Sequence, residues 1–321
     1  FDSILSDFFS DHKIINVQKL DRLEINSSNF KVHAMCDGVE NILFVRKNKL
    51  IDNKKQLVFY LDLLFRLRKA GIKVNRVLKT MDDTCFVDLE GSLYVVSEFI
   101  TAQHFFPTEK NFMSVASELA KLHEEFAGLN NWDIDYIKVL SEECDTYFNK
   151  NKKYSQNDFL KIKLLIENKK KYSNHDKLVL EKMSLLLETV MEVEKKKLLF
   201  DELPRQIIHS DLHPHNLLMG DGGLKAIVDF DGMRFSERAR DVGFAIYRLG
   251  RQFFVDNKKD YNYAEKLKNN FIEEYCLSNL LSEKEKDLMP YLVKDEFLRK
   301  ILFVLNGIYL EDNHTWAQDV G

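Results

Sequence analysis

Between residues 15 and 98, apolar and polar positions alternate in short runs, which is typical of half-buried β-strands. One segment differs, because Leu57, Leu61 and Leu64 recur at helical spacing and Gly71 follows as a stop signal. Asp37-Gly38 is a strong hairpin-turn signal between two of the extended runs. The pattern predicts a small α+β region, with a helix over 54–70 and strands over 16–25, 30–36, 41–47, 85–89 and 93–99.

After Thr101 the apolar positions follow the period of amphipathic helices, as in 112–126 and in the Lys/Glu-rich stretch 147–199. Pro204 interrupts this pattern before three short strand candidates, and helices resume near Asp241. The change of period near Ile100 predicts two lobes, an N-terminal one over 1–100 and a mainly helical one over 101–321. The short strands are expected at 206–208, 217–219 and 225–228.

Composition limits the class of protein. The 321 residues are 45% hydrophobic, which is enough for two packed lobes. A formal net charge of −4 gives no reason to expect nucleic acid or a membrane as a partner. No apolar run approaches the roughly 18 residues of a membrane span, and no basic leader precedes an apolar segment. Four widely spaced cysteines without a Cys-x-x-Cys pair predict reduced thiols, so we expect a cytoplasmic protein: Cys36, Cys85, Cys144 and Cys276.

The densest group of chemically useful residues begins after the 206–208 strand. Residues 208–216 are Ile-His-Ser-Asp-Leu-His-Pro-His-Asn, and 228–231 are Val-Asp-Phe-Asp. Phosphoryl transfer needs a carboxylate that orients and deprotonates a hydroxyl, and oxygen ligands that hold Mg²⁺ against phosphates. Asp211, Asn216 and Asp229 meet this need, with the spacing of the protein-kinase motifs H-R-D-x-x-x-x-N and D-F-G. A single loop aspartate is usually a cap, but the joint spacing favours chemistry.

These motifs resemble the H-G-D-x-x-x-x-N and I-D-F-D signature of the aminoglycoside phosphotransferase, choline kinase and homoserine kinase-like family. Residues 117–123 are similar to its L-A-x-L-H helix, and 240–243 to its D-L-A helix start. The resemblance implies a two-lobed protein-kinase-like fold with a nucleotide-binding N-terminal lobe and a catalytic, substrate-binding C-terminal lobe. It implies ATP and Mg²⁺ as cofactors and a small-molecule hydroxyl as acceptor. Asp211 would be the base, Asn216 and Asp229 the metal ligands, and His209 a residue that braces the loop.

The phosphate side departs from the family pattern. Strand alternation places Arg46 on one face with Ile42 and Phe44, so Arg46 is the expected phosphate contact, with Lys47 as its rival. A turn at 26–29 would cover the phosphates with Ser27, Ser28 and Asn29, although an ordinary turn would look the same.

On the predicted helix, Tyr60 stands where the family pattern leads us to expect a glutamate. Resemblance alone assigns adenine to the hinge residues Glu98, Phe99 and Ile100.

The acceptor side is less defined. Asp231, His213 and Arg234 are candidate acceptor contacts. A solvent-facing role is commoner for a loop histidine such as His213, and Asp231 is evenly balanced between acceptor contact and structural hydrogen bonding. Asp241 is expected to be structural, with its carboxylate on backbone amides at a helix start. The basic stretch 150–171 is more typical of a solvated helix face.

Three functions are compatible with these motifs to different degrees. The favoured one is a Mg-ATP phosphotransferase that acts on an amino alcohol, sugar, amino acid or antibiotic. The alternative is a kinase-like binding or scaffold protein with weak or no turnover, which the irregular phosphate segment and Tyr60 favour slightly. A protein kinase fits less well, because His-Ser-Asp replaces His-Arg-Asp and Asp241 follows Asp229 by only 12 positions.

Overall fold

The computed structural model describes residues 1–20, 27–48, 54–129, 133–137, 154–255 and 261–313. The chain divides into two compact units. The first contains Phe1–Glu125 and His213–Phe230, and the second contains Phe126–Leu212 and Asp231–Gly321. The division therefore falls inside the 208–216 motif, between Leu212 and His213.

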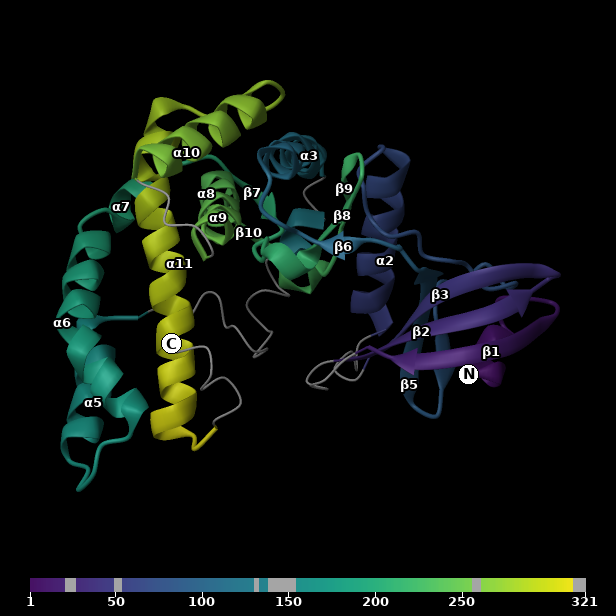
Figure 1. Cartoon of the computed structure of the whole chain (residues 1–321), viewed down its shortest axis with the longest axis horizontal. Coiled ribbons are helices and arrows are strands. Elements are labelled where there is room, and N and C mark those ends of the chain that lie inside the picture. The colour runs from purple at the N-terminus through teal and green to yellow at the C-terminus, as the bar shows by residue number, and fades with distance from the viewer. Residues whose placement is uncertain (21–26, 49–53, 130–132, 138–153, 256–260, 314–321) are drawn as a thin grey trace. The chain divides into compact units, whose positions relative to one another are not determined.

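A five-stranded antiparallel sheet forms much of the first unit (Figure 1), in the order β1-β2-β3-β5-β4. Asp37-Gly38 and Glu90-Gly91 make its tight hairpin turns, with φ values of 48° and 78° and of 52° and 73°. Two consecutive positive φ values match the right-handed twist of the flanking strands. Ile4, Leu5 and Phe8 at the N-terminus pack with Val32 and Val45 of the sheet in one buried cluster. The strands are β1 (His12–Lys19), β2 (Ser27–Cys36), β3 (Val39–Asn48), β4 (Val87–Leu89) and β5 (Ser92–Glu98).

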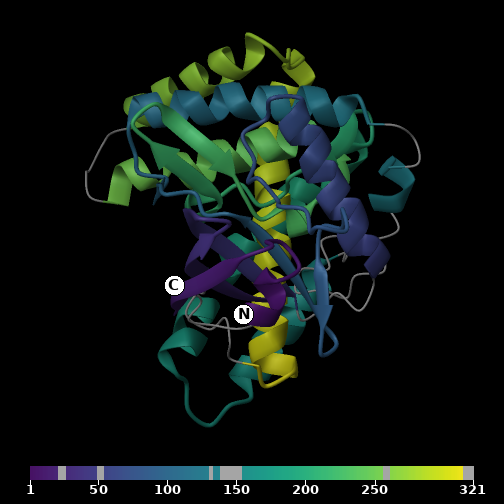
Figure 2. The same cartoon turned by 90° about the vertical axis from the view of Figure 1, so that its right-hand side faces the viewer.

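Two helices and a small sheet complete the first unit. Helix α2 (Lys54–Lys69) ends before Gly71, whose φ is 86°. Strand β6 (Gln103–His104) pairs with β8 (Leu217–Gly220), which pairs with β9 (Gly223–Ile227). This β8–β9 hairpin lies against α3 (Glu109–Ala127) (Figure 2), where the Leu224 amide donates to Ser114 Oγ at 2.8 Å. A Cβ on Gly223 would lie 2.5 Å from that oxygen, so the contact requires glycine.

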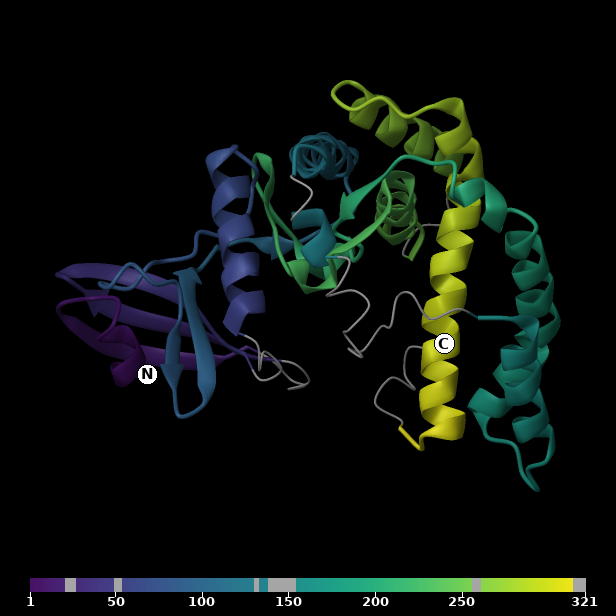
Figure 3. The same ribbon diagram turned by 180° about the vertical axis from the view of Figure 1, so that it is seen from behind.

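The second unit is mainly helical around one short antiparallel pair, β7 (Arg205–Ile208) with β10 (Arg234–Glu237). Three of its helices begin with a serine whose side chain and a carboxylate three residues later cap each other across the helix start. The long helix α11 packs against α5, α6 and α8, and Figure 3 shows α5 and α6 along its side. The helices include α5 (Gln156–Glu167), α6 (Asn174–Glu194), α7 (Lys197–Phe200), α8 (Arg238–Gly250), α9 (Gln252–Val255), α10 (Tyr261–Cys276) and α11 (Glu283–Leu310).

The predicted fold class is confirmed, since an antiparallel sheet with the short helix α1 (Asp2–Leu5) and the longer helix α2 precedes a mainly helical region. The predicted turn at 26–29 is wrong where the structure describes it. Ser27, Ser28 and Asn29 begin β2 and pair with residues of β3, because the ladder needs only backbone groups. Asn26 lies outside the described residues. The first strand covers His12–Lys19, so it begins four residues before the predicted 16–25 strand, whose positions 21–25 lie outside the described residues. No helix in the described part of the chain is long and apolar enough to cross a membrane.

Candidate active site

A buried carboxylate shapes the loop that carries Asp211. The Asp241 side chain, 0% exposed, accepts hydrogen bonds from the amides of His209 at 2.8 Å and Ser210 at 2.7 Å. The Asp211 amide donates to His209 Nδ1 at 3.2 Å. Ser210 has φ 70°, a left-handed conformation that costs free energy for any residue except glycine. The loop backbone is thus held in a strained shape, while the Asp211 side chain keeps 27% of its surface exposed.

Asp241 has the structural role expected from the sequence, but its amide partners differ. It lies in the first turn of α8, and the amides that it binds belong to the 209–210 loop rather than to the helix start. His209 is fully buried and bonded to the loop, as the bracing role requires.

Asn216 and Asp229 stand at the open end of the β8–β9 hairpin. Leu217 pairs with Ile227, and the Val228 amide donates to the Asn216 carbonyl at 3.0 Å. Asn216 therefore lies immediately before β8, and Asp229 lies two residues after β9. Asn216 is 5% exposed, whereas Asp229 is exposed and has φ 63°. One amide oxygen and one carboxylate at this end are the hard donors that Mg²⁺ takes.

These two residues suit a Mg²⁺ ion that is held mainly by phosphates. No group of three or more His, Cys, Asp or Glu side chains is placed to bind a metal within the described ranges. A Mg²⁺ ion that bridges phosphates usually takes only one or two protein carboxylates and keeps several waters. The donor set of Asn216 and Asp229 therefore fits the cofactor inferred from the motif.

Helix α2 reaches the segment after Asp229 through Tyr60. The Tyr60 hydroxyl accepts a hydrogen bond from the Phe230 amide at 3.4 Å. At the position where the family pattern leads us to expect a glutamate, this helix thus carries a neutral hydroxyl directed at the backbone beside Asp229. The sequence indicated the departure at Tyr60, but its partner lies 170 residues away and no local pattern identifies it.

Arg46 and Lys47 occupy opposite faces of β3, as strand alternation predicts. Leu43 and Val45 are buried in the cluster on one face. Lys47 follows on that same face and lies across the ladder from Tyr94, with Nζ 5.6 Å from the centre of its ring. Arg46 is on the other face, opposite Asn29 of β2. The two cations therefore have different surroundings and can be tested separately.

The predicted adenine segment is already engaged in backbone bonds. The amides of Glu98 and Phe99 donate to the carbonyls of Arg76 at 2.9 Å and Ile42 at 3.0 Å. The Glu98 carboxylate accepts from Arg76 at 2.7 Å. Main-chain recognition of a base at 98–100 would have to use other groups, such as the Glu98 carbonyl or the Ile100 amide.

The three candidate acceptor contacts have different surroundings. His213 caps a short 3-10 turn (Pro214–Asn216), since its Nδ1 accepts from the His215 amide at 3.2 Å. Asp231 is exposed. Arg234 is 4% exposed and donates to Glu296 Oε2 at 2.5 Å. This burial favours a positioning role for Arg234 over direct contact with an acceptor.

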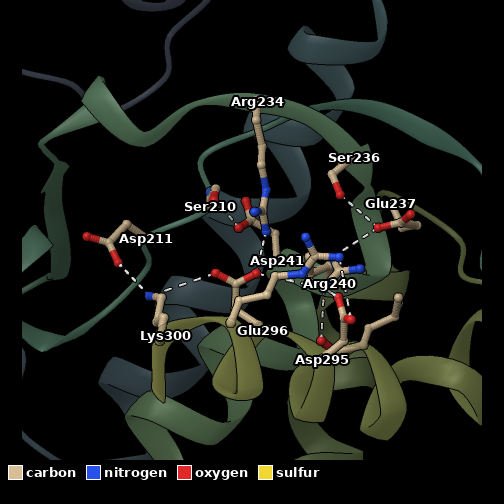
Figure 4. Close-up of polar contacts among 12 residues, drawn as sticks. Ser210, Asp211, Arg234, Ser236, Glu237, Arg240, Asp241, Asp295, Glu296 and Lys300 are labelled. Atoms are coloured by element: carbon tan, nitrogen blue, oxygen red, sulfur yellow. Dashed lines mark hydrogen bonds and ion pairs between the residues drawn. The ribbon is translucent and has the colours of Figure 1, made fainter. Parts of the chain in front are cut away.

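A buried ionic network lies beside the Asp211 loop (Figure 4), centred on Arg240. Arg240 Nε donates to Glu237 Oε2 at 2.9 Å, and its Nη1 donates to Asp295 Oδ2 at 2.7 Å. Burial raises the pKa of the Asp295 carboxyl, but the Arg240 and Arg299 cations outweigh burial and hold that pKa below its ordinary value. Burial also opposes ionisation of Glu237, yet Arg240 and the Ser236 hydroxyl keep its pKa low.

Lys300 lies beside Asp211, although the sequence analysis did not single it out. It projects from α11, and its Nζ lies 3.2 Å from Asp211 Oδ1 and 4.0 Å from Glu296 Oε1. Lys300 is one of 47 Lys and Arg residues and is 89 positions from Asp211, so no spacing rule selects it.

This chain is similar to several phosphotransferases. A homoserine kinase from Zymomonas mobilis subsp. mobilis is 23% identical over 289 residues, which cover 84% of this chain and 79% of that protein. The crystal structure of a spectinomycin phosphotransferase with ADP and spectinomycin has a TM-score of 0.69 at 15% identity, over 97% of this chain and 88% of that one. An amicoumacin kinase with AMP-PNP and Ca²⁺ has a TM-score of 0.64 at 13% identity, over 92% and 82%.

The structural likenesses show a shared fold. The sequence profile of the Phosphotransferase enzyme family matches residues 28–269, which include both catalytic motifs. This match confirms the family resemblance that the motifs indicated. The chain therefore belongs to the phosphotransferase enzyme family.

Proposed function

We propose that this protein uses ATP and Mg²⁺ to phosphorylate a hydroxyl group of a small molecule. The observation that carries the proposal is the way in which each unit presents its own motif residues. A strained loop held by Asp241 presents Asp211, and the open end of one hairpin carries Asn216 and Asp229. In phosphoryl transfer the protein contributes mainly positioned charges rather than covalent chemistry. These residues supply such charges and metal ligands.

Each residue then has one task. Asp211 orients the acceptor hydroxyl and takes its proton as the oxygen attacks the γ-phosphorus. Asn216 and Asp229 hold the metal, and Arg46 binds phosphate oxygens through its planar guanidinium. Bound Mg²⁺ would neutralise charge on the phosphates. The homoserine and spectinomycin enzymes act on small molecules that carry a hydroxyl, which supports an acceptor of that kind.

The rival proposal is a kinase-like binding protein without turnover. Tyr60 in place of an acidic helix residue and the engaged amides of Glu98 and Phe99 favour it. The two proposals differ in one product. A phosphotransferase forms a phosphomonoester from ATP and acceptor, whereas a binding protein retains nucleotide and forms none.

A screen for that product tests the proposed function. The chain is incubated with Mg-ATP and L-homoserine, ethanolamine, 1-amino-2-propanol or spectinomycin, and phosphorus NMR follows formation of a phosphomonoester. We expect a new phosphomonoester signal with one class of acceptor, and no such signal with the Asp211→Asn variant. The chain could instead bind nucleotide in a magnesium-dependent way and form no phosphomonoester, even with a broader panel of hydroxyl compounds. That result would support the binding-protein proposal.

Replacing Arg46 with alanine is expected to raise the KM for ATP by roughly 10- to 100-fold, because a charge-assisted hydrogen bond contributes about 1.5–3 kcal/mol. Lys47→Ala is the matched control, since it removes the neighbouring cation from the opposite face of β3. Its KM for ATP should stay near that of the parent protein. A larger effect of Lys47→Ala than of Arg46→Ala, measured by steady-state kinetics, would show that the phosphate contact was assigned to the wrong face.

A further inference from the structure

Lys300 occupies a defined place beside the Asp211 carboxylate. Its Nζ is at hydrogen-bond distance from Asp211 Oδ1, 3.2 Å, and lies 4.2 Å from the centre of the Phe244 ring. The side chains of Lys300 and Asp211 keep 20% and 27% of their surface exposed. Figure 4 shows the ammonium between Asp211 and Glu296. An apolar ring on one side and two carboxylates on the others restrict where this flexible side chain can lie.

The helix that carries Lys300 is anchored by buried charges. One turn before Lys300, Glu296 pairs with Arg234 at 2.5 Å, and the adjacent Asp295 pairs with Arg240 at 2.7 Å. Both carboxylates are almost fully buried. Gly243 of α8 lets the two helices approach closely, because a Cβ there would lie 2.5 Å from Met289 Cγ of α11. The segment of α11 before Lys300 is therefore tied to β10 and α8 by buried charge pairs and close packing.

Charged and titratable groups approach the Asp211 loop from three of the elements packed around it in the described part of the chain. Lys300 and Glu296 come from α11, Arg234 from β10 and Asp241 from α8, while His209 lies in the loop itself. Glu296 is engaged by Arg234 at 2.5 Å and lies farther from Lys300, at 4.0 Å. Of these two carboxylates, the one on Asp211 is therefore the nearer to the Lys300 ammonium.

We propose that Lys300 is a positioning residue, which orients the Asp211 carboxylate and keeps it ionised for phosphoryl transfer. The inference rests on the proposed role of Asp211 as the base. In that step the acceptor oxygen forms a bond to the γ-phosphorus, the bond from that phosphorus to the β–γ bridging oxygen breaks, and the hydroxyl proton moves to Asp211. A base must be deprotonated and correctly aimed before the step begins. A nearby ammonium favours the charged carboxylate and restrains its rotation.

Substitution of Lys300 by methionine tests this role, because methionine keeps the length of the apolar stem and removes the charge. Lys294→Met is the matched control. Lys294 lies on the same helix, pairs with Glu192 at 2.6 Å and lies 5.5 Å from the Tyr291 ring centre, but it belongs to a different surface cluster. Lys300→Arg restores the cation, and Lys300→Gln is a second neutral variant if methionine prevents folding.

The first readout needs no acceptor. A water-soluble carbodiimide with glycinamide modifies protonated carboxyl groups, and peptide mass spectrometry follows the modification of Asp211 against pH. We expect modification of Asp211 in Lys300→Met to extend to a pH higher by about one unit, since removal of an opposite charge at this range shifts a carboxyl by about one to three units before solvent screening. Lys294→Met and Lys300→Arg should follow the parent protein. An unchanged Asp211 profile in both neutral variants would overturn the proposal.

The second readout is turnover with Mg-ATP and the acceptor found in the screen. We expect kcat of Lys300→Met to fall roughly 10- to 100-fold, the range for partners that orient a functional group. The KM for ATP should stay near that of the parent protein, and the acid limb of the pH–rate profile should move to higher pH. A fall in kcat without that pH shift would indicate a merely structural lysine and contradict the proposal. If Asp211→Asn keeps full turnover while the carbodiimide profile still depends on Lys300, the ion pair stands and the proposed base is wrong.

Discussion

Replacing Arg240 with methionine is expected to lower the free energy of unfolding by about 3–5 kcal/mol, because removal of one partner leaves buried charges uncompensated. Arg240 is 5% exposed and donates to Glu237, to Asp295 and to the Leu292 carbonyl. Methionine fills similar space but satisfies none of these oxygens. Urea unfolding at pH 7, followed by circular dichroism, measures the difference.

The expected pH dependence distinguishes a loss of ion pairs from a general loss of packing. The pKa values of Asp295 and Glu237 lie below their ordinary values in the folded protein. Their contribution to stability is therefore present above about pH 4, the ordinary range of carboxyl groups, and is lost as pH falls below it. Burial raises the pKa of both carboxyls, and Arg240 counteracts it. Without Arg240, both pKa values should therefore rise. The difference in stability between parent and variant should then be larger at pH 7 than near pH 4.

Arg299→Met is the control for Arg240. Arg299 also donates to Asp295, at 2.9 Å, but 22% of its side chain is exposed and water can replace part of its contact. We expect a loss of only about 1 kcal/mol for a partly solvated pair. Equal losses for the two variants, or a loss for Arg240→Met that does not change with pH, would show that the buried network is not what stabilises this part of the unit.

The chemical motif was accessible from the sequence because its spacing is local. Asp211 and Asn216 are five positions apart. Between Asn216 and Asp229, the sequence pattern predicts two short strands, because side chains alternate along a strand. The same alternation separated Arg46 from Lys47 correctly. The segment at 27–29 was misjudged because serine and asparagine favour turns, whereas here backbone pairing with β3 decides the conformation.

Contacts between distant segments were not accessible in this way. Lys300 and Asp211 meet only because α11 packs against α8, and Tyr60 reaches Phe230 only because α2 lies near the end of the β8–β9 hairpin. Asp241 could be assigned a structural role from its place at a helix start, but its choice of loop amides depends on how α8 meets β7. A charge in a Lys/Glu-rich helix looks solvated until the fold supplies its partner.

Changing Asp211 to asparagine is expected to leave binding of Mg-ATP nearly intact and to lower turnover by roughly 10²–10⁴-fold, the usual range for a general base. The amide keeps the shape of the carboxylate and its place after the strained Ser210, but it takes up no proton from the acceptor. Calorimetry with ATP, with and without Mg²⁺, measures binding, and steady-state assays measure turnover.

Asp229 should behave differently, because the proposal makes it a metal ligand. Its replacement by alanine should weaken magnesium-dependent binding of ATP as well as turnover, since a hard cation depends on carboxylate oxygen. Alanine also tolerates the observed φ of 63° less well than aspartate, so Asp229→Asn is the second variant, which keeps that preference and removes the charge. Asn216→Ala should show the same defect more weakly, because a neutral amide holds a divalent ion less firmly.

Asp221→Ala controls for damage to the hairpin, since Asp221 is exposed in the turn at its other end. It should bind Mg-ATP like the parent protein. In the absence of Mg²⁺, the difference in ATP affinity between Asp229→Asn and the parent should shrink, because the side chain at 229 acts on the nucleotide through the metal. If Asp211→Asn abolishes nucleotide binding while both Asp229 variants keep binding and turnover, the division of roles between base and metal ligand is wrong.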